Sequence, residues 1–457
     1  MLSRQGPRRL LQVLSRTQLS RRFLSSSRVM TSLANGKDEM ALQQPRQFPT
    51  TGFEVIDPAQ KLEEERLPFY ICDEYYPMQI GEVIHVHYQV VAKLGYGVTS
   101  TVWLARDLRD AKYWALKVYI NTMQHNQELL VYKHLANAPT NTPTELGFQN
   151  VRQSHESFQI DGPAGKHDVL VMKPLGMSLR SFQDMQQTGF FPRETVAGAM
   201  GQVFLGMNLL LEADVIHTGI LIYTLVLSGS ITNCIELDLH ADNLLIALTD
   251  ESILSRVEQN EIDTPIARKQ LGERFIYGSQ YVLGGAGPLV ISDFGQARIG
   301  AEQHGNAMPV PYRAPEVILG MQWGPEVDRW SAGLLAWDLL EKEKLFDVYD
   351  SESQEHNDAC HLAAMTALMG PPPRVFLERS PATRKYWDDD GDWTGLVPLP
   401  TERTFESLAT SLKGDERDTF LNFVQCFVWW VPERRLTALQ GYMHPFVQGK
   451  TMPKAVE

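Results

Sequence analysis

Residues His217 to Asn243 read HTGILIYTLVLSGSITNCIELDLHADN. The stretch starts with His217-Thr218, ends with DLHADN from Asp238 to Asn243, and has nineteen residues, Gly219–Leu237, in between. Without those nineteen residues it would read HTDLHADN, which has the spacing His-x-Asp-x-x-x-x-Asn. A pattern this short also occurs by chance, so its meaning depends on the rest of the chain.

This spacing is typical of a catalytic loop for phosphoryl transfer. In such a loop the aspartate, here Asp238, accepts the proton of the attacking hydroxyl, and the asparagine, here Asn243, holds a metal ion on the nucleotide phosphates. A general base must lie within hydrogen-bond reach of its proton. Extra residues between His217 and Asp238 are therefore expected to disturb the loop.

Three interpretations of Gly219–Leu237 compete. A membrane segment is disfavoured because the stretch is short and contains Ser, Thr, Asn and Gly, and a genuine insertion is disfavoured because it displaces the base. Nineteen codons are 57 nucleotides, in frame, and the codons at the two ends permit a GT donor and a TAG acceptor, with a CTAAC branch point permitted at Thr232-Asn233. We expect a retained intron, so that the functional protein joins Thr218 to Asp238.

The composition is that of a globular protein. The chain has 457 residues, enough for one two-lobed domain or two domains, with 43% hydrophobic and 21% charged residues. A net charge of -13 discourages nucleic-acid partners and suits basic peptides, although it also serves solubility. The cysteines lack metal-ligand spacing and are expected to be reduced: Cys72, Cys234, Cys360 and Cys426.

The first 37 residues contain seven arginines and no acidic residue, a composition typical of a mitochondrial transit peptide. Arg21-Arg22-Phe23-Leu24-Ser25 resembles a matrix-peptidase site, and cleavage after Phe23 would remove six arginines and lower the net charge from -13 to -19. The alternatives are a disordered basic tail, or a true start at Met30 or Met40. We expect mitochondrial import.

Residues 38–74 are expected to form a polar linker and an extended lead-in. Apolar alternation then predicts strands at Tyr88–Ala92, Thr101–Ala105 and Tyr113–Tyr119. The segment Gly95–Ser100, GYGVTS, joins the first two strands, and its glycines allow backbone amides to approach phosphates.

Lys117 lies in the third of these strands, where a charge is costly without a partner. Residues Gln127 to Leu135 predict a helix that leaves Glu128 available for Lys117, and such a pair would hold the lysine against the α and β phosphates. The alternatives are a lysine that reaches solvent and a solvated glutamate. The helix is expected to bury Leu129, Leu130 and Leu135.

A strand predicted at Val169–Met172 leads into Lys173-Pro174-Leu175-Gly176, a connector between two lobes. Pro174 has no amide proton, so adenine contacts would use the Lys173 carbonyl and the Leu175 amide. Beyond it, long helical patterns such as Glu194–Ala213 predominate. The fold class predicted is α+β, with a small β-rich lobe and a larger helical lobe.

Further motifs follow the interrupted loop. Leu244–Ala247 predicts a strand, and a second apolar strand ends in Asp293-Phe294-Gly295, which places a carboxylate where it can hold magnesium. Ala314-Pro315-Glu316 and Asp328–Gly333 come later. Near the end, Arg435 offers a cation that could be buried against Glu316.

In this order the motifs resemble the eukaryotic protein kinases over residues 75–447, with the N-lobe at about 75–175, the C-lobe at about 176–447 and a tail at 448–457. Within that superfamily the chain is most similar to the serine/arginine-rich-protein kinases in their fungal form. The segments behind this likeness are Tyr75-Tyr76-Pro77, Lys93–Gly97 and His217-Thr218. Residues 249–287 occupy the position of that family's variable spacer.

The resemblance implies a role for each matching residue. Asp238 is the catalytic base, Lys117 with Glu128 clamps the phosphates, and Asn243 with Asp293 holds Mg2+. ATP would be bound by Leu94, Gly95, Gly97, Ser100, Val102, Ala115, Lys117, Lys173 and Leu175. The structural residues would be His217, Glu316, Asp328, which braces the loop backbone, and Arg435.

Two residues depart from the family pattern. His240 stands where a lysine is usual, which puts the rate and the hydroxyl preference in doubt, and Thr218 replaces an arginine. No serine or threonine lies between Asp293 and Arg313. We therefore expect activity without phosphorylation of this segment.

The resemblance implies an ATP-dependent protein serine/threonine kinase for basic, Ser/Arg-rich proteins, monomeric, without nucleic-acid or membrane partners, in cytosol and nucleus. One alternative is a kinase-like binding module without turnover, which the interrupted loop favours. Another is a small-molecule kinase, against which Ala314-Pro315-Glu316 and Asp328–Gly333 argue because they shape a peptide platform. The acidic loop Asp388–Asp392 either docks a basic peptide or merely coats a turn, and we favour the second interpretation.

Overall fold

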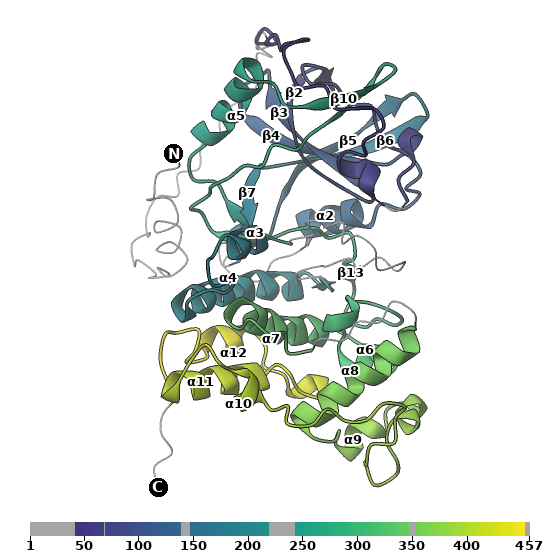
Figure 1. The fold of residues 1–457 in the computed structure, drawn as a ribbon, viewed down its shortest axis with the longest axis vertical. Helices are drawn as coiled ribbons and strands as arrows, with labels where there is room; N and C mark the ends of the chain where they lie inside the picture. The colour runs from purple at the N-terminus through teal and green to yellow at the C-terminus, as the bar shows by residue number, and fades with distance from the viewer. Residues whose placement is uncertain (1–41, 68, 139–146, 219–242, 347–352, 453–457) are drawn as a thin grey trace, which may run out of the picture.

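The computed structural model describes residues 42–67, 69–138, 147–218, 243–346 and 353–452. Figure 1 shows two lobes stacked along the long axis of the molecule, one built mainly on a sheet and one mainly on helices. Four predictions lie outside the described residues: the targeting segment 1–37, the insert 219–237, and the roles of Asp238 and His240.

The N-lobe is built on a six-stranded antiparallel sheet in the order β1-β2-β3-β4-β6-β5. All the strands predicted in this lobe are confirmed, and β4 has the predicted bounds. The strands are β1 (Val83–Ile84), β2 (Tyr88–Gly97), β3 (Ser100–Asp107), β4 (Tyr113–Tyr119), β5 (Ser154–Gly162) and β6 (Gly165–Met172).

Helix α2 (Gln127–Asn137) packs beside this sheet and begins at Asn126, whose side chain accepts a hydrogen bond from the Leu129 amide. The predicted burial of Leu130 is wrong, because its side chain is 51% exposed. Glu128, Val131 and Tyr132 take the buried face instead. These three positions share one helical stripe, from which Leu130 is turned away.

The C-lobe packs around two long buried helices, α4 (Arg193–Glu212) and α7 (Glu326–Leu340). Small sheets lie where the lobes meet: β7 (Leu175–Ser178), β9 (Leu244–Ala247) and β12 (Leu289–Ile291) form one, and β8 (Val215–Ile216) and β13 (Arg298–Ile299) the other. The other helices are α3 (Leu179–Asp184), α6 (Pro315–Ile318), α8 (Gln354–Met369), α9 (Arg374–Leu377), α10 (Phe405–Leu408), α11 (Gly414–Gln425) and α12 (Ala438–Met443).

The spacer, residues 249–287, lies in the C-lobe range along the chain but packs on the N-lobe (Figure 1). It forms helix α5 (Ser252–Asp263) and the hairpin of β10 (Arg268–Leu271) and β11 (Arg274–Tyr277). Its residues Leu254, Val257 and Val282 share one buried cluster with side chains of β2 and β3. The spacer therefore forms an outer layer of the N-lobe.

The lead-in belongs to the same layer and includes two short 3-10 turns, η1 (Glu63–Arg66) and η2 (Cys72–Glu74). Glu64 is buried and forms an ion pair with Lys93 of β2, which is fully buried. A second pair joins Lys269 of the spacer to Glu65, with 2.8 Å between Nζ and Oε1. Because buried charges need partners, these pairs fix the lead-in between the sheet and the spacer.

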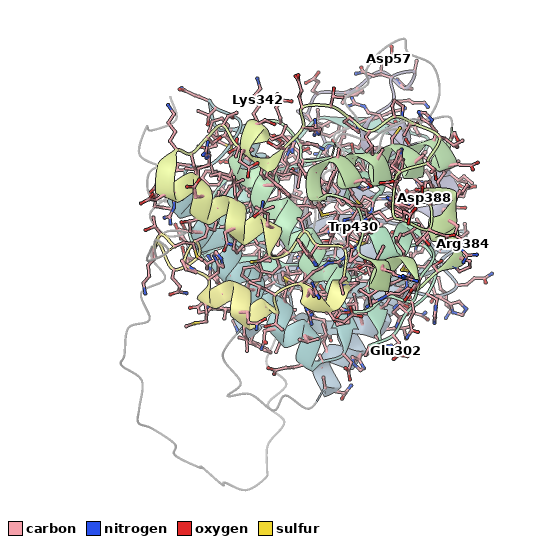
Figure 2. The ribbon with its side chains drawn as sticks, turned by 90° about the horizontal axis from the view of Figure 1, so that it is seen from below. Asp57, Glu302, Lys342, Arg384, Asp388 and Trp430 are labelled. Atoms are coloured by element: carbon pink, nitrogen blue, oxygen red, sulfur yellow. The ribbon has the colours of Figure 1, made fainter. Side chains whose placement is uncertain are left out.

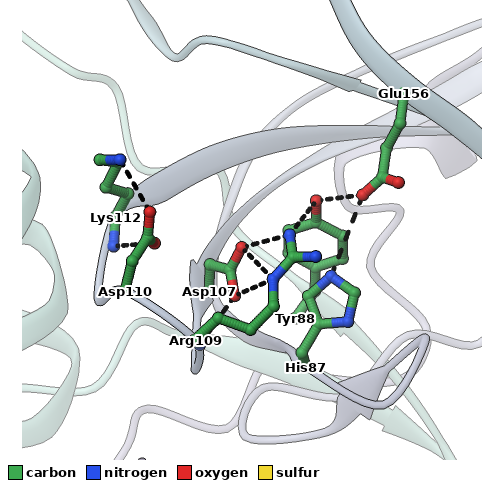
Figure 3. A network of polar contacts seen from close by, with 7 residues as sticks. All are labelled: His87, Tyr88, Asp107, Arg109, Asp110, Lys112 and Glu156. Carbon is green, nitrogen blue, oxygen red and sulfur yellow. Dashed lines mark hydrogen bonds and ion pairs between the residues drawn. The ribbon is translucent and has the colours of Figure 1, made fainter. Parts of the chain in front are cut away.

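A polar network joins the turn after β3 to β2 and β5 (Figure 3). Arg109 contacts Asp107, with 2.6 Å between Nη2 and Oδ2, and Tyr88 of β2 donates a hydrogen bond to Glu156 of β5. The network thus links β2, next to one edge of the sheet, to β5 at the opposite edge. Figure 3 also draws His87 and a more exposed ion pair in which Lys112 Nζ lies 2.8 Å from Asp110 Oδ2.

Candidate active site

Lys117, Glu128 and Asp293 come together where β4, α2 and the end of β12 meet. Lys117 Nζ lies 2.5 Å from Glu128 Oε2 and 3.6 Å from Asp293 Oδ1, which confirms the predicted Lys117–Glu128 pair. Burial disfavours the charged ammonium, but the two carboxylates still raise the pKa of Lys117 above its ordinary value. In turn, Lys117 lowers the pKa of Asp293 against the effect of burial, so both groups stay charged.

Tyr119 also belongs to this cluster, although it is not among the residues predicted from the sequence. Its hydroxyl donates a hydrogen bond to Glu128 Oε2 over 2.9 Å. Tyr119 follows Lys117 by two positions in a strand, so both side chains lie on the same face of the sheet. That spacing was the available signal. The contact fixes the carboxylate that orients Lys117.

The glycine-rich segment is the hairpin between β2 and β3. Gly97 is paired with Ser100 and Gly95 with Val102, and Val102 is paired in turn with Lys117 of β4. The register therefore places the hairpin next to the strand that carries the lysine. The position of the glycines over the nucleotide phosphates stays a prediction.

Three of the residues predicted to bind ATP, Ala115, Lys173 and Leu175, lie around the lobe connector. Ala115 is buried and pairs with Met172, the last residue before Lys173. Leu175 begins β7 and pairs with Ala247. The Lys173 carbonyl, predicted to face adenine, also accepts a hydrogen bond over 3.2 Å from Arg152 Nη2, a contact for which the sequence held no signal.

Asp328 holds both residues that precede the insert. Its Oδ2 accepts a hydrogen bond from the His217 amide over 2.7 Å, and its Oδ1 accepts one from the Thr218 amide over 2.8 Å. Burial raises the pKa of Asp328 to about 6, although the two amides oppose the shift. The predicted bracing of the loop backbone by Asp328 is therefore present on this side of the insert.

Ser292 contacts both His217, which precedes the insert, and Asn243, which follows it in the chain. The Ser292 carbonyl lies 3.1 Å from His217 Nε2, and its amide donates to the Asn243 carbonyl over 2.7 Å. A carbonyl oxygen only accepts, so Nε2 carries the proton. Burial lowers the pKa of His217 to about 4, which keeps this imidazole neutral at pH 7. His217 and Asn243 are thus joined through Ser292.

Phe294, next to Asp293, connects His217 to the N-lobe. It is fully buried, and its ring lies 5.2 Å from that of Tyr132 in α2 and 5.1 Å from that of His217, both edge-on. Such pairs stabilise the contact beyond the area they bury. The two ring contacts join α2, the segment that contains Asp293, and His217.

In the C-lobe, Glu316 and Arg435 form the predicted buried pair. The contacts are bidentate, at 2.6 Å from Nη1 and 2.7 Å from Nη2, and both side chains are almost completely buried. Arg435 also donates to the carbonyls of Trp429 (3.1 Å) and Glu326 (3.0 Å). These contacts join α6 to the start of α7 and to the segment around Trp429 and Arg435.

The acidic loop is internally bonded. Asp388 Oδ1 accepts from the amides of Asp390 (3.1 Å) and Asp392 (2.8 Å), so Asp388 has a structural role in its own turn. Figure 2, which views the molecule from the C-lobe end, shows Asp388 near Arg384 on the same side of the molecule. This geometry supports the interpretation that the acidic residues cover a surface turn and do not dock a peptide.

A search of family models matches the protein kinase domain to residues 280–447. The matched part begins within the spacer and lies after the insert 219–237. Among curated proteins, a serine/threonine protein kinase of Aspergillus fumigatus is 37% identical over 409 residues, which is 88% of this chain and 95% of that protein.

More distant relatives extend the likeness. A serine/threonine-protein kinase named SRPK from Physarum polycephalum is 26% identical, over 84% of this chain and 91% of its own length. The dual specificity protein kinase CLK1 of Homo sapiens is 24% identical, over 80% of this chain and 67% of its own. Given this coverage and the site geometry, the chain belongs to the protein kinase family and is a serine/threonine protein kinase.

Proposed function

We propose that the chain transfers the γ-phosphoryl group of ATP, with Mg2+, to serine and threonine hydroxyls of basic, Ser/Arg-rich proteins. Membership of the family implies ATP as the donor and a divalent metal. The observation that carries the residue assignment is the meeting of Lys117, Glu128 and Asp293 beside the glycine-rich hairpin.

The residues around Asp293 fit Mg2+ by their chemistry. The Asp293 side chain is 46% exposed. Asn243, whose backbone carbonyl accepts a hydrogen bond from the Ser292 amide, offers a side-chain amide oxygen. Mg2+ prefers oxygen ligands and binds through one or two carboxylates together with substrate phosphates. When bound, the metal would neutralise charge on the transferred group. Asp293 and Asn243 are the residues that would hold it.

A basic substrate is supported by the charge of the protein and by its relatives. The chain has a net charge of -13, and its mature form would be more acidic if the arginine-rich start is removed. Opposite charges favour association with basic peptides. The Physarum relative bears the name SRPK, a family name that matches the resemblance seen in the sequence.

Three peptides of equal length test the substrate: a serine in an arginine-rich context, the same serine with glutamates replacing the arginines, and a tyrosine in the arginine-rich context. We expect kcat/KM to be highest for the first, because it alone combines charge and hydroxyl type. Equal values for the first two would refute the basic preference. Preferred transfer to the tyrosine would refute the hydroxyl assignment.

The second candidate is a kinase-like binding module, favoured by one observation: the insert separates Thr218 from Asp238 along the chain. The same peptide assay on the full chain decides this point. ATP binding without any transfer to the three peptides would support the binding module for the chain as written.

We predict that activity does not require phosphorylation of the segment from Asp293 to Arg313. Within it, Gln303 exchanges two backbone hydrogen bonds with Trp323, over 2.8 and 3.0 Å, and Trp323 Nε1 donates to the Gly305 carbonyl over 3.0 Å. Its one hydroxyl, on Tyr312, is occupied by Asp338 at 2.6 Å. Phosphatase treatment should leave kcat/KM unchanged. Loss of activity, with a phosphorylation site mapped to this segment, would contradict the prediction.

We also propose that residues 1–23 direct import into mitochondria, on the basis of their arginine-rich, acid-free composition. A fluorescent reporter fused to these residues should accumulate in mitochondria, and replacing the six arginines by glutamine should abolish import. A reporter that stays in the cytosol would favour the cytosolic and nuclear location that the family resemblance implies.

A further inference from the structure

Tyr75, at the end of the lead-in, contacts the tip of the glycine-rich hairpin. Its hydroxyl lies 2.8 Å from the Val98 carbonyl oxygen and 3.1 Å from that of Gly97, so one proton is shared between two acceptors. The side chain is buried, and burial raises the pKa of Tyr75, so the hydroxyl keeps its proton and acts as a donor. Tyr75 is not one of the nucleotide-binding residues assigned above.

The backbone around Tyr75 is fixed from two sides. Arg274 of the spacer donates to the carbonyls of Cys72 and Tyr75 and lies 2.8 Å from the Cys72 sulfur. From the end of β4, the Asn121 amide donates to the Glu74 carbonyl over 3.0 Å, and its side chain donates to the Asp73 carbonyl over 2.9 Å. The hydroxyl of Tyr75 is therefore presented by a segment that is itself held in place.

The contact also orients the amides of the hairpin. In a trans peptide the carbonyl and the following N–H point in opposite directions, and the described residues contain no cis peptide bond. When Tyr75 holds the carbonyls of Gly97 and Val98, the amides of Val98 and Thr99 point away from it. The Thr99 carbonyl is fixed separately, by the Ile120 amide at 3.0 Å.

We propose that Tyr75 is a positioning residue for the nucleotide phosphates: it holds the hairpin tip with the Val98 and Thr99 amides turned toward the bound phosphates. The inference rests on the nucleotide site proposed above. A hairpin that is ordered before ATP arrives loses less conformational entropy on binding. The contribution of Tyr75 should therefore depend on phosphates and not on adenosine.

The variant Tyr75→Phe removes the hydroxyl and keeps the ring. We expect Kd for Mg-ATP, measured calorimetrically on the full chain, to rise about fivefold, as the loss of one ordinary hydrogen bond supports. Kd for adenosine should not change. The matched control is Tyr76→Phe, which removes the neighbouring hydroxyl, bonded to Glu82 at 2.9 Å, and should leave both constants unchanged.

Equal thermal midpoints for the two variants would show that loss of folding is not the cause. An unchanged Kd for ATP in Tyr75→Phe, or an equal weakening of ATP and adenosine, would overturn the inference while the wild type still binds ATP. A wild-type chain that binds neither ligand would overturn the nucleotide site itself and this inference with it.

Discussion

Replacing Lys117 or Asp293 with alanine is expected to abolish phosphoryl transfer in any active form of the protein. Lys117 Nζ lies between the Glu128 carboxylate at 2.5 Å and the Asp293 carboxylate at 3.6 Å. Each substitution removes a charge placed where the phosphates and the metal would bind. Loss of one preorganised group of this kind typically costs about 10²–10³-fold in rate, and here two motifs depend on the same contact.

The chain provides a matched control for both substitutions. Lys112 and Asp110 form another lysine–aspartate pair in the same lobe, with 2.8 Å between the charged atoms, but it lies in a more exposed turn (Figure 3). Lys112→Ala and Asp110→Ala should keep wild-type kcat and KM for ATP, because an exposed pair contributes little. Unchanged turnover in Lys117→Ala or Asp293→Ala would refute the assignment of these residues to the site.

Removing Gly219–Leu237 is expected to give the active form of the enzyme. Ser292 contacts described residues on both sides of the insert, the His217 imidazole at 3.1 Å and the Asn243 carbonyl at 2.7 Å. In a chain without the insert, the five residues Asp238 to Asp242 are therefore enough to connect Thr218 to Asn243. A misplacement of about 1 Å at a catalytic group can cost about 10²-fold in rate, so we expect the full chain to be at least that much slower.

The comparison uses the full chain, the shortened chain and the shortened chain carrying Asp238→Ala. The shortened chain should transfer phosphate to a Ser/Arg-rich peptide, and Asp238→Ala should remove this activity, which ties the gain to the restored base. Sequencing of the transcript should show a species that lacks the 57 nucleotides encoding the insert. Transcripts that all contain them, together with an inactive shortened protein, would refute the proposal.

Local pattern and motif order were enough to predict several strands and two ion pairs. The bounds of β4 and β9 match the predicted ones because alternation over a few residues fixes which strand face is buried. The Lys117–Glu128 and Glu316–Arg435 pairs could be predicted because each joins two motifs whose order along the chain indicated the fold. Tyr119 could have been added from its spacing alone.

The spacer and the lead-in depended on tertiary structure. Glu258 and Glu261 of α5 are fully buried, Glu258 against Tyr113 at 2.6 Å and Glu261 against Arg268 at 2.8 Å, although a charged helix would normally be assigned to the surface. Leu130 is exposed because the buried face of α2 is the one formed by Glu128, Val131 and Tyr132.

The contacts of Tyr75 with the glycine-rich hairpin and of Lys93 with Glu64 join residues about 20 to 30 positions apart that share no periodicity. The sequence itself therefore determined which residues carry charge and which strands and helices form, since these follow from chemistry within a few residues. Only the packing of distant segments decided which of those charges are buried together, because burial depends on the surface that arrives from elsewhere in the chain.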